Sequence, residues 1–127
     1  MKLYESGEDY LEAVLVLQKK IGEVRSVDVA RYVGVSKPSV CHAVNVLCDG
    51  GFLTKDDKHF ISLTEEGRKV AEKIYERHCF FTKYLTEMGV DPKLAESDAC
   101  KLEHVISDEC FQKLKESTRI GSEKEEV

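Results

Sequence analysis

The order of the predicted elements in the first half of the chain constrains the fold more than any other feature of the sequence. Three stretches with apolar residues at helical spacing are followed by two short strand patterns around a polar turn. Gly34 lies in the turn before the third helix, and a glycine pair ends that helix. Helix, helix, turn, helix and hairpin in this order predict a winged helix-turn-helix. The five elements are expected at residues 5–20, 26–32, 36–49, 52–54 and 60–63.

The second half of the chain is expected to be helical. Thr64 is followed by two acidic residues, which is typical of a helix start, and the apolar positions continue to Met88. Asp91-Pro92 and Ser107-Asp108 begin two further helices. The fold class is therefore predicted to be mainly α. The expected organisation is a winged helix-turn-helix domain over residues 1–63, an all-helical domain over 64–118 and a flexible tail over 119–127.

The long helix from Thr64 is expected to take part in a homodimer. Its large apolar side chains occupy more than one face, a stripe too wide for a small single core to cover. These side chains are Tyr75, Phe80, Phe81, Tyr84 and Leu85.

The third helix and the hairpin carry the residues expected to contact DNA. In a helix-turn-helix the third helix enters the major groove with its N-terminal residues first, and here Val40, Val44 and Leu47 face inward. The opposite face presents short polar groups and a proline, which can reach phosphates, base edges and thymine methyl groups. The predicted DNA-contacting residues are Ser36, Lys37, Pro38, Ser39, His42, Lys55 and Lys58.

Charge and composition permit nucleic-acid binding without requiring it. The net charge is −5, yet residues 24–73 carry 8 basic and 7 acidic side chains, against 8 and 12 in residues 74–127. No apolar run approaches the ~18 residues of a membrane span, and the N-terminus lacks the pattern of a signal peptide. We therefore expect a cytoplasmic protein without a membrane segment, whose five cysteines are free thiols.

A cluster of metal-ligand residue types lies in the second half of the chain. Cys100, Glu103 and His104 stand at positions i, i+3 and i+4, which share one face of a helix. A thiolate, a carboxylate and an imidazole all bind transition metals. Taken singly, each side chain is more simply explained as a surface or packing residue, whereas a set drawn from three helices suffices for a six-coordinate site. The other candidates in this set are Asp9, Glu12 and His78.

These motifs resemble the iron- and manganese-dependent repressors, the diphtheria toxin repressor and manganese transport regulator group. The resemblance runs from residue 5 to about 118. Residues 98–108 (Asp-Ala-Cys-Lys-Leu-Glu-His-Val-Ile-Ser-Asp) carry it most specifically. It implies a homodimeric, non-enzymatic repressor of metal-uptake genes that binds palindromic operators when loaded with Mn(II) or Fe(II). The supporting stretches are residues 8–12, 36–40, 63–67 and 77–78.

The resemblance also implies a ligand set of mixed type. Asp9, His78, Cys100, Glu103 and His104 match metal-ligand positions of the family, and Glu12 matches a ligand of the manganese branch. Manganese-type members have an acid at the position of Cys100, and iron-type members have a methionine at the position of Asp9. A thiolate favours iron, zinc or cobalt, whereas an added carboxylate favours manganese. Mn(II) or Fe(II) is the expected corepressor. Zn(II) and Co(II) are expected to bind the same site in vitro.

Two departures from the iron-type members are visible. Thr82 and Glu96 replace the carboxylate and the histidine of their ancillary metal site. The chain is also expected to lack their C-terminal SH3-like domain, and so resembles the short, two-domain form of the family.

Three other functions fit parts of the sequence. Oxidation of Cys100 or Cys79 would make the chain a thiol-based redox regulator, which requires an exposed thiol of low pKa. Cys100, Glu103 and His104 would serve an enzyme as a catalytic metal site or a Cys–His pair. No glycine-rich substrate element supports the enzyme. A winged-helix protein without metal dependence is the third alternative.

Overall fold

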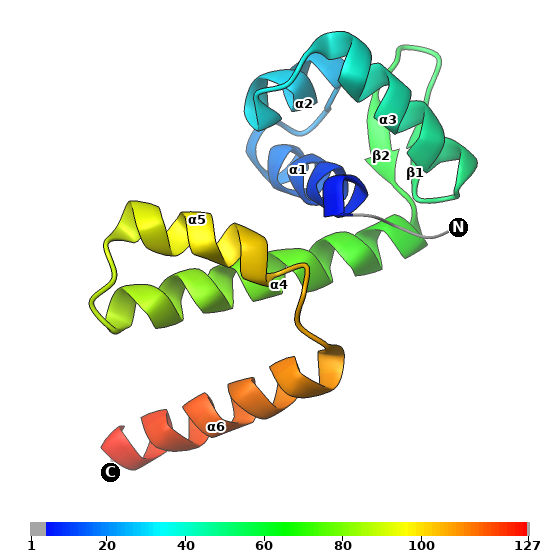
Figure 1. Ribbon diagram of the computed structural model, residues 1–127. Helices are drawn as coiled ribbons and strands as arrows, with labels where there is room; N and C mark the ends of the chain where they lie inside the picture. Colours follow the sequence, from blue (N-terminus) through cyan, green and yellow to red (C-terminus); the bar gives the residue numbers. More distant parts are fainter. Residues whose placement is uncertain (1–4, 127) are drawn as a thin grey trace. The chain divides into compact units, whose positions relative to one another are not determined.

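The computed structural model describes residues 5–126, which form six helices and one hairpin (Figure 1). They divide into two compact units, Met1–Glu76 and Arg77–Val127. This architecture confirms the predicted fold class, a mainly α chain with a winged helix-turn-helix ahead of a helical part. The elements are α1 (Glu5–Ile21), α2 (Ser26–Val33), α3 (Lys37–Asp49), β1 (Leu53–Lys55), β2 (Ile61–Leu63), α4 (Glu65–Glu87), α5 (Pro92–Leu102) and α6 (Asp108–Glu126).

The core of the first unit is built from one apolar face of each helix and from the hairpin. Val40, Val44 and Leu47 of α3 are buried, as the helical spacing predicts. They join buried residues of α1 and α2 and the first strand residues of the hairpin in one cluster. The other members include Leu11, Val14, Leu15, Val24, Val29, Leu53 and Ile61.

Local capping fixes the turn between α2 and α3. Gly34 ends α2 with φ 83°, a left-handed conformation that glycine adopts without steric cost. Ser36 then caps α3, because its hydroxyl oxygen accepts a hydrogen bond from Ser39 N at 3.3 Å. Pro38 lies in the first turn of α3, where its missing N–H is not needed. The turn therefore places the N-terminus of α3 at the surface.

The start of α2 differs from the prediction by one residue. Arg25, rather than Ser26, is the N-cap residue, and Ser26 begins the helix. The cause is Asp28, whose Oδ2 accepts a hydrogen bond from Arg25 N at 2.9 Å.

The wing is a short antiparallel hairpin with an ordered tip. Leu53 pairs with Leu63, and Ile61 forms a further bridge to Val24. The Oδ1 atom of Asp56 accepts hydrogen bonds from the backbone N–H groups of Lys58 and Phe60, each at 2.9 Å. These bonds close the turn that joins the two strands.

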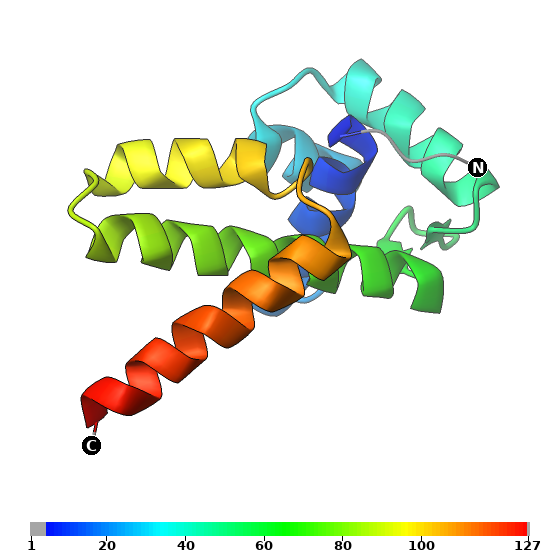
Figure 2. The same ribbon diagram turned by 60° about the horizontal axis from the view of Figure 1, so that its bottom comes forward.

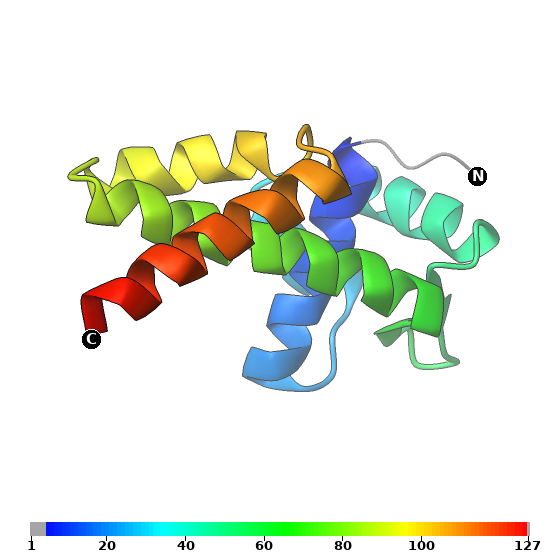
Figure 3. The same cartoon turned by 90° about the horizontal axis from the view of Figure 1, so that it is seen from below.

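The second unit consists of the C-terminal part of α4 together with α5 and α6. Figures 1 and 2 show α5 running back alongside α4, and Figure 3 shows α6 crossing α4 obliquely. Phe81 of α4, Ala99 of α5 and Phe111 of α6 form its buried core. Phe80 packs edge-on against both Phe81 and Phe111, at centroid distances of 5.3 and 5.4 Å.

The two compact units divide inside α4, between Glu76 and Arg77, because Val70, Ala71 and Tyr75 pack with the core of the first unit. The domain boundary expected at residue 64 stays a prediction. The last helix continues to Glu126, past residue 118 where the folded part was expected to end. The mobility of residues 119–127 stays a prediction. Every helix in the described part of the chain is too short or too polar to cross a membrane.

Candidate metal centre and nucleic-acid interface

Three metal-ligand side chains of the second unit converge on one point. His78, Cys100 and Glu103 each offer one ligand atom, and these atoms all lie within 4.8 Å of one another. His78 Nδ1 lies 2.9 Å from Glu103 Oε2 and 3.6 Å from Cys100 Sγ. The fold thus brings a nitrogen, a sulfur and an oxygen together, although His78 is 22 and 25 residues from the other two along the chain.

The carboxylate of Glu103 is the centre of this cluster. The side chain is 0% exposed, and its Oε2 faces His78. Its Oε1 lies 3.3 Å from His104 Nε2, but it has no hydrogen-bond partner among the described residues. A buried carboxylate oxygen without a donor is costly, and a cation would supply the missing partner. The donor set and this oxygen therefore fit a divalent transition metal.

The elements that carry these residues differ slightly from the prediction of a single helical turn. Cys100 lies in the last turn of α5, whereas Glu103 and His104 follow the end of that helix at Leu102. Glu103 nevertheless keeps helical backbone angles, φ −61° and ψ −22°, and its N–H donates to Ala99 O. The spacing between Cys100 and Glu103 is thus preserved through the first residue of the turn.

Asp9 and Glu12, the remaining predicted ligands, lie on α1 in the first unit. They are one helical turn apart, so both side chains belong to the same face, and both are half-buried. Their participation in a metal site stays a prediction from the sequence.

Thr82 and Glu96, at the positions of the iron-type ancillary site, line a hollow of the second unit next to His78. Among the described residues, neither belongs to a group of three metal-ligand side chains. The incomplete ancillary site stays a prediction from the sequence.

The predicted DNA-contacting residues are all exposed on one part of the first unit. Ser36, Lys37, Pro38, Ser39 and His42 lie on the N-terminal turns of α3 or at its cap, opposite the buried valines. Lys55 ends β1 and Lys58 lies at the wing tip. The structure gives these residues the exposure that nucleic-acid contact requires.

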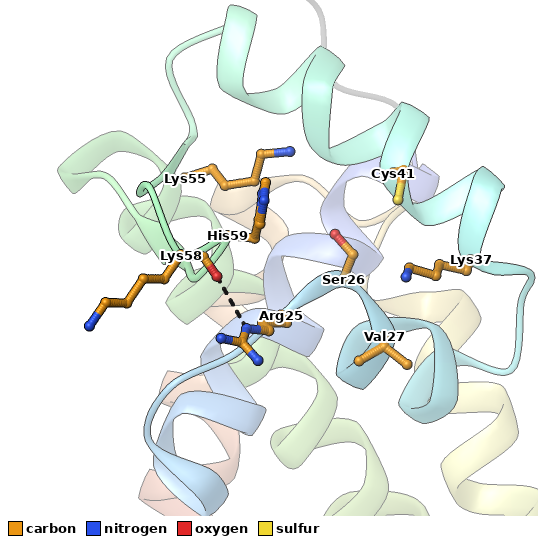
Figure 4. Close-up of a pocket in the computed structure, with 8 residues that line it drawn as sticks. All are labelled: Arg25, Ser26, Val27, Lys37, Cys41, Lys55, Lys58 and His59. Atoms are coloured by element: carbon orange, nitrogen blue, oxygen red, sulfur yellow. Dashed lines mark hydrogen bonds between the residues drawn. The ribbon is translucent and has the colours of Figure 1, made fainter.

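A basic cleft connects the start of α3 with the wing (Figure 4). Lys37 lies at one end and Lys55 and Lys58 at the other. Arg25, for which no sequence motif predicts a role, lies between α2 and the wing; its Nε donates to Lys58 O at 3.2 Å. Its guanidinium also stands over the ring of Phe60 at 4.3 Å. The hydrogen-bond partner of Arg25 is 33 residues away, so the contact leaves no local pattern in the sequence. The only nearby feature that marks Arg25 is its position just before a helix.

All five cysteines are free thiols, as expected. Cys79, Cys100 and Cys110 are exposed, and Cys41 and Cys48 are partly buried. Burial raises the pKa of the Cys48 thiol; Lys55 lowers it and Asp49 raises it by smaller amounts. Cys100 alone among them contacts a candidate ligand, His78.

Comparison with family models assigns both halves of the chain. Residues 2–59 match the N-terminal DNA-binding domain of iron-dependent repressors. Residues 64–119 match the metal-binding and dimerisation domain of the same proteins.

Individual relatives agree with this match. The transcriptional regulator MntR of Escherichia coli O157:H7 is 36% identical over 102 residues, covering 80% of this chain and 66% of its own length. An HTH-type transcriptional regulator of Methanocaldococcus jannaschii is 33% identical over 113 residues, covering 87% of this chain and 90% of its own length. The structure of the manganese regulator SloR shares the fold, with a TM-score of 0.80 at 24% identity over 94% of this chain and 55% of that one. The chain thus spans about two thirds of MntR and about half of SloR.

Proposed function

Because this chain belongs to the iron-dependent repressor family of transcriptional regulators, we propose that it is a metal-dependent repressor that binds DNA as a homodimer. The family consists of DNA-binding regulators and not of enzymes. We further propose Mn(II) or Fe(II) as the corepressor and metal-uptake genes as the targets, with palindromic operators read by the two subunits of the dimer.

The observation that carries the proposal is the convergence of His78, Cys100 and Glu103. A divalent metal bound there would supply positive charge to the buried Glu103 carboxylate and tie α4 to the end of α5. His104 contacts the other oxygen of Glu103 and is the fourth candidate ligand. Asp9 and Glu12 are proposed, from the sequence alone, to add oxygen ligands.

The choice between manganese and iron depends on two opposing features. The Cys100 sulfur is a soft ligand that favours Fe(II), Zn(II) or Co(II) over Mn(II). The carboxylates favour Mn(II), and the named relatives MntR and SloR include a manganese regulator. We propose that the chain accepts both metals, with a smaller preference for Mn(II) than an all-oxygen-and-nitrogen site would have.

The exposed surfaces support the proposed partners. The polar face of α3 and the basic cleft beside it provide the groups that DNA contacts require. The second unit exposes large apolar side chains that a second copy would cover. These are Met88, Leu94, Leu102 and Val105, which are 65%, 54%, 36% and 75% exposed.

The test uses DNA duplexes selected from a random-sequence library by the full chain in the presence of Mn(II). Binding to the selected duplex is then measured by fluorescence anisotropy with Mn(II), Fe(II), Zn(II), Co(II) or a chelator, and bound metal is measured on the protein. We expect binding that is at least tenfold tighter with Mn(II) or Fe(II) than in chelator, about 1.4 kcal/mol. Equal affinity in chelator and in metal would refute metal dependence.

Thiol-based redox sensing is the second candidate, because the exposed Cys100 sulfur lies 3.6 Å from an imidazole nitrogen. This function predicts that peroxide abolishes DNA binding of the metal-loaded chain and that Cys79→Ser leaves this loss intact. A metal response that survives peroxide treatment would exclude it.

A further inference from the structure

We propose that Arg77 is a positioning residue of the metal centre, which holds the turn after α5 so that Glu103 and His104 are in place before a metal binds. The inference rests on the proposed metal-binding function. Arg77 contacts the backbone of the turn that carries Glu103 and His104, and it is not itself a metal ligand.

Arg77 is unusual because a charged side chain on a helix is normally exposed. It is 3% exposed, and Arg77 and Glu103 are the buried charged residues of the described chain. Removing a guanidinium from water is unfavourable unless hydrogen bonds and a countercharge replace the water. The partners of Arg77 therefore show what its burial achieves.

Those partners lie in the turn after α5 (residues 103–107) and at the start of α6. Arg77 Nη1 donates to Glu103 O at 3.3 Å and to Ile106 O at 2.6 Å. Its Nη2 pairs with the carboxylate of Asp108, the first residue of α6. The two carbonyls bracket residues 103–106, so one guanidinium fixes both ends of the segment that carries Glu103 and His104.

The turn needs such a donor because it follows a helix end. The last carbonyl groups of a helix lack partners within the helix and accept hydrogen bonds from other groups. From the neighbouring helix α4, Arg77 donates to the carbonyl of Glu103, the C-cap residue of α5, and to that of Ile106 in the turn beyond it. The next residue of α4, His78, contacts the Glu103 side chain directly. Two consecutive residues of α4 therefore hold Glu103, one by its backbone and one by its carboxylate.

The planar guanidinium is required for this arrangement. It directs one nitrogen to two carbonyls and another to a carboxylate, whereas a lysine ammonium has no such fork. The Arg77 guanidinium also stands over the ring of Phe111 at 5.3 Å, in the apolar core of the unit. Lysine at this position would keep the charge but lose the shape, and methionine would keep most of the volume but lose both.

The test measures Co(II) binding to the full chain by absorption spectroscopy, because cobalt reports both affinity and coordination through its thiolate and d–d bands. Arg77→Lys and Arg77→Met are expected to weaken Co(II) binding about 10- to 100-fold, the usual effect of losing a group that orients ligands. Asp108→Asn is the matched control, because it removes the exposed countercharge and leaves both carbonyl bonds. It is expected to change the affinity less than threefold, on the order of 0.6 kcal/mol.

A second control distinguishes positioning of the metal ligands from a general contribution of Arg77 to stability. Phe81→Leu thins the apolar core on which Ile106 of the turn packs, but it removes none of the hydrogen bonds between Arg77 and the turn. It is expected to lower the free energy of unfolding and to leave the Co(II) affinity and spectrum unchanged. The proposal is overturned if the Arg77 variants bind Co(II) with wild-type affinity, or lose no more affinity than Phe81→Leu at equal stability.

Hydrogen exchange in the metal-free wild type keeps the proposal testable if the Arg77 variants do not fold. The Val105 amide, which donates to Leu102 O at 3.2 Å, is expected to be protected without metal. Protection that arises only on Co(II) addition would show that the turn is not preset and would overturn the proposal. A wild-type chain that binds no Co(II), Mn(II) or Fe(II) would instead refute the proposed metal centre, and this inference with it.

Discussion

Gly67 of α4 lies against the backbone carbonyl of Phe52: a Cβ atom on Gly67 would be 1.9 Å from Phe52 O. The neighbour is backbone and cannot rotate away. Thr64 strengthens the same contact, because its N–H donates to Phe52 O at 3.1 Å. The absence of a side chain at this position therefore allows the start of α4 to pack on the wing.

Gly67→Ala is expected to destabilise the protein by about 1–3 kcal/mol or more, the cost of inserting a methyl group into a filled space. Urea unfolding of the metal-free chain measures the change. Glu66→Ala, at an exposed position of the same turn, is the control and should change stability by no more than about 0.5 kcal/mol. A Gly67→Ala protein as stable as the control would mean that α4 does not pack so closely.

Cys100→Asp is expected to shift metal preference towards manganese. It replaces a soft sulfur beside His78 with a hard oxygen, so the ratio of Mn(II) to Co(II) affinity should rise by about tenfold, roughly 1.4 kcal/mol. Competition titration followed by metal analysis measures the ratio. Cys110→Ser changes an exposed thiol outside the cluster and should leave the ratio as it is. An unchanged ratio in Cys100→Asp would remove the thiolate from the site.

Substitutions on the exposed face of α3 are expected to weaken DNA binding alone. Lys37→Ala, Ser39→Ala and His42→Ala should each lower the affinity for the selected duplex. None of them should change metal binding by the protein or its oligomeric mass in solution. Loss of a phosphate contact at Lys37 should also reduce the slope of log K against log salt by about one. Lys69→Ala, an exposed lysine of α4, is the control. Unchanged affinity in all three variants would exclude α3 as the DNA-contacting helix.

The partly buried Cys48 thiol predicts a pH dependence of reactivity and stability. Its pKa is raised above the ordinary value of 9.0, mainly by burial. As pH rises through that value the unfolded chain loses the proton first, so the unfolded state binds fewer protons and folding stability falls. Alkylation of Cys48 should therefore lag behind that of the exposed Cys79, and the alkaline loss of unfolding free energy should be smaller in Cys48→Ala. Equal alkylation rates for the two thiols would contradict this.

The local elements could be predicted because their signals lie within a few residues. Helical spacing located Val40, Val44 and Leu47 in the core, and Ser36 and Gly34 gave the turn between α2 and α3. The first wing strand was predicted one residue early, and the second was predicted one residue too long at its start. Strands of three residues carry too little periodicity to fix their ends.

The long-range contacts of single side chains were not predictable in the same way. Arg77 has the sequence context of a surface charge, and its burial follows from carbonyls 26 and 29 residues further along the chain. The same holds for Arg25, whose partner lies in the wing. The approach of His78 to Glu103 was suggested by family resemblance, because spacing along the sequence carries no information about it.

The closed turn of the wing affects the entropy of any binding event there. Asp56 holds the backbone of Lys58 and Phe60, and Arg25 ties the Lys58 carbonyl to the start of α2. A loop that becomes ordered only on binding loses affinity, on the order of 1 kcal/mol for each flexible group that is fixed. The backbone beneath Lys58 has already lost this freedom during folding. The conformational entropy of the wing is therefore lost during folding, and a ligand that contacts the wing does not lose affinity by ordering it.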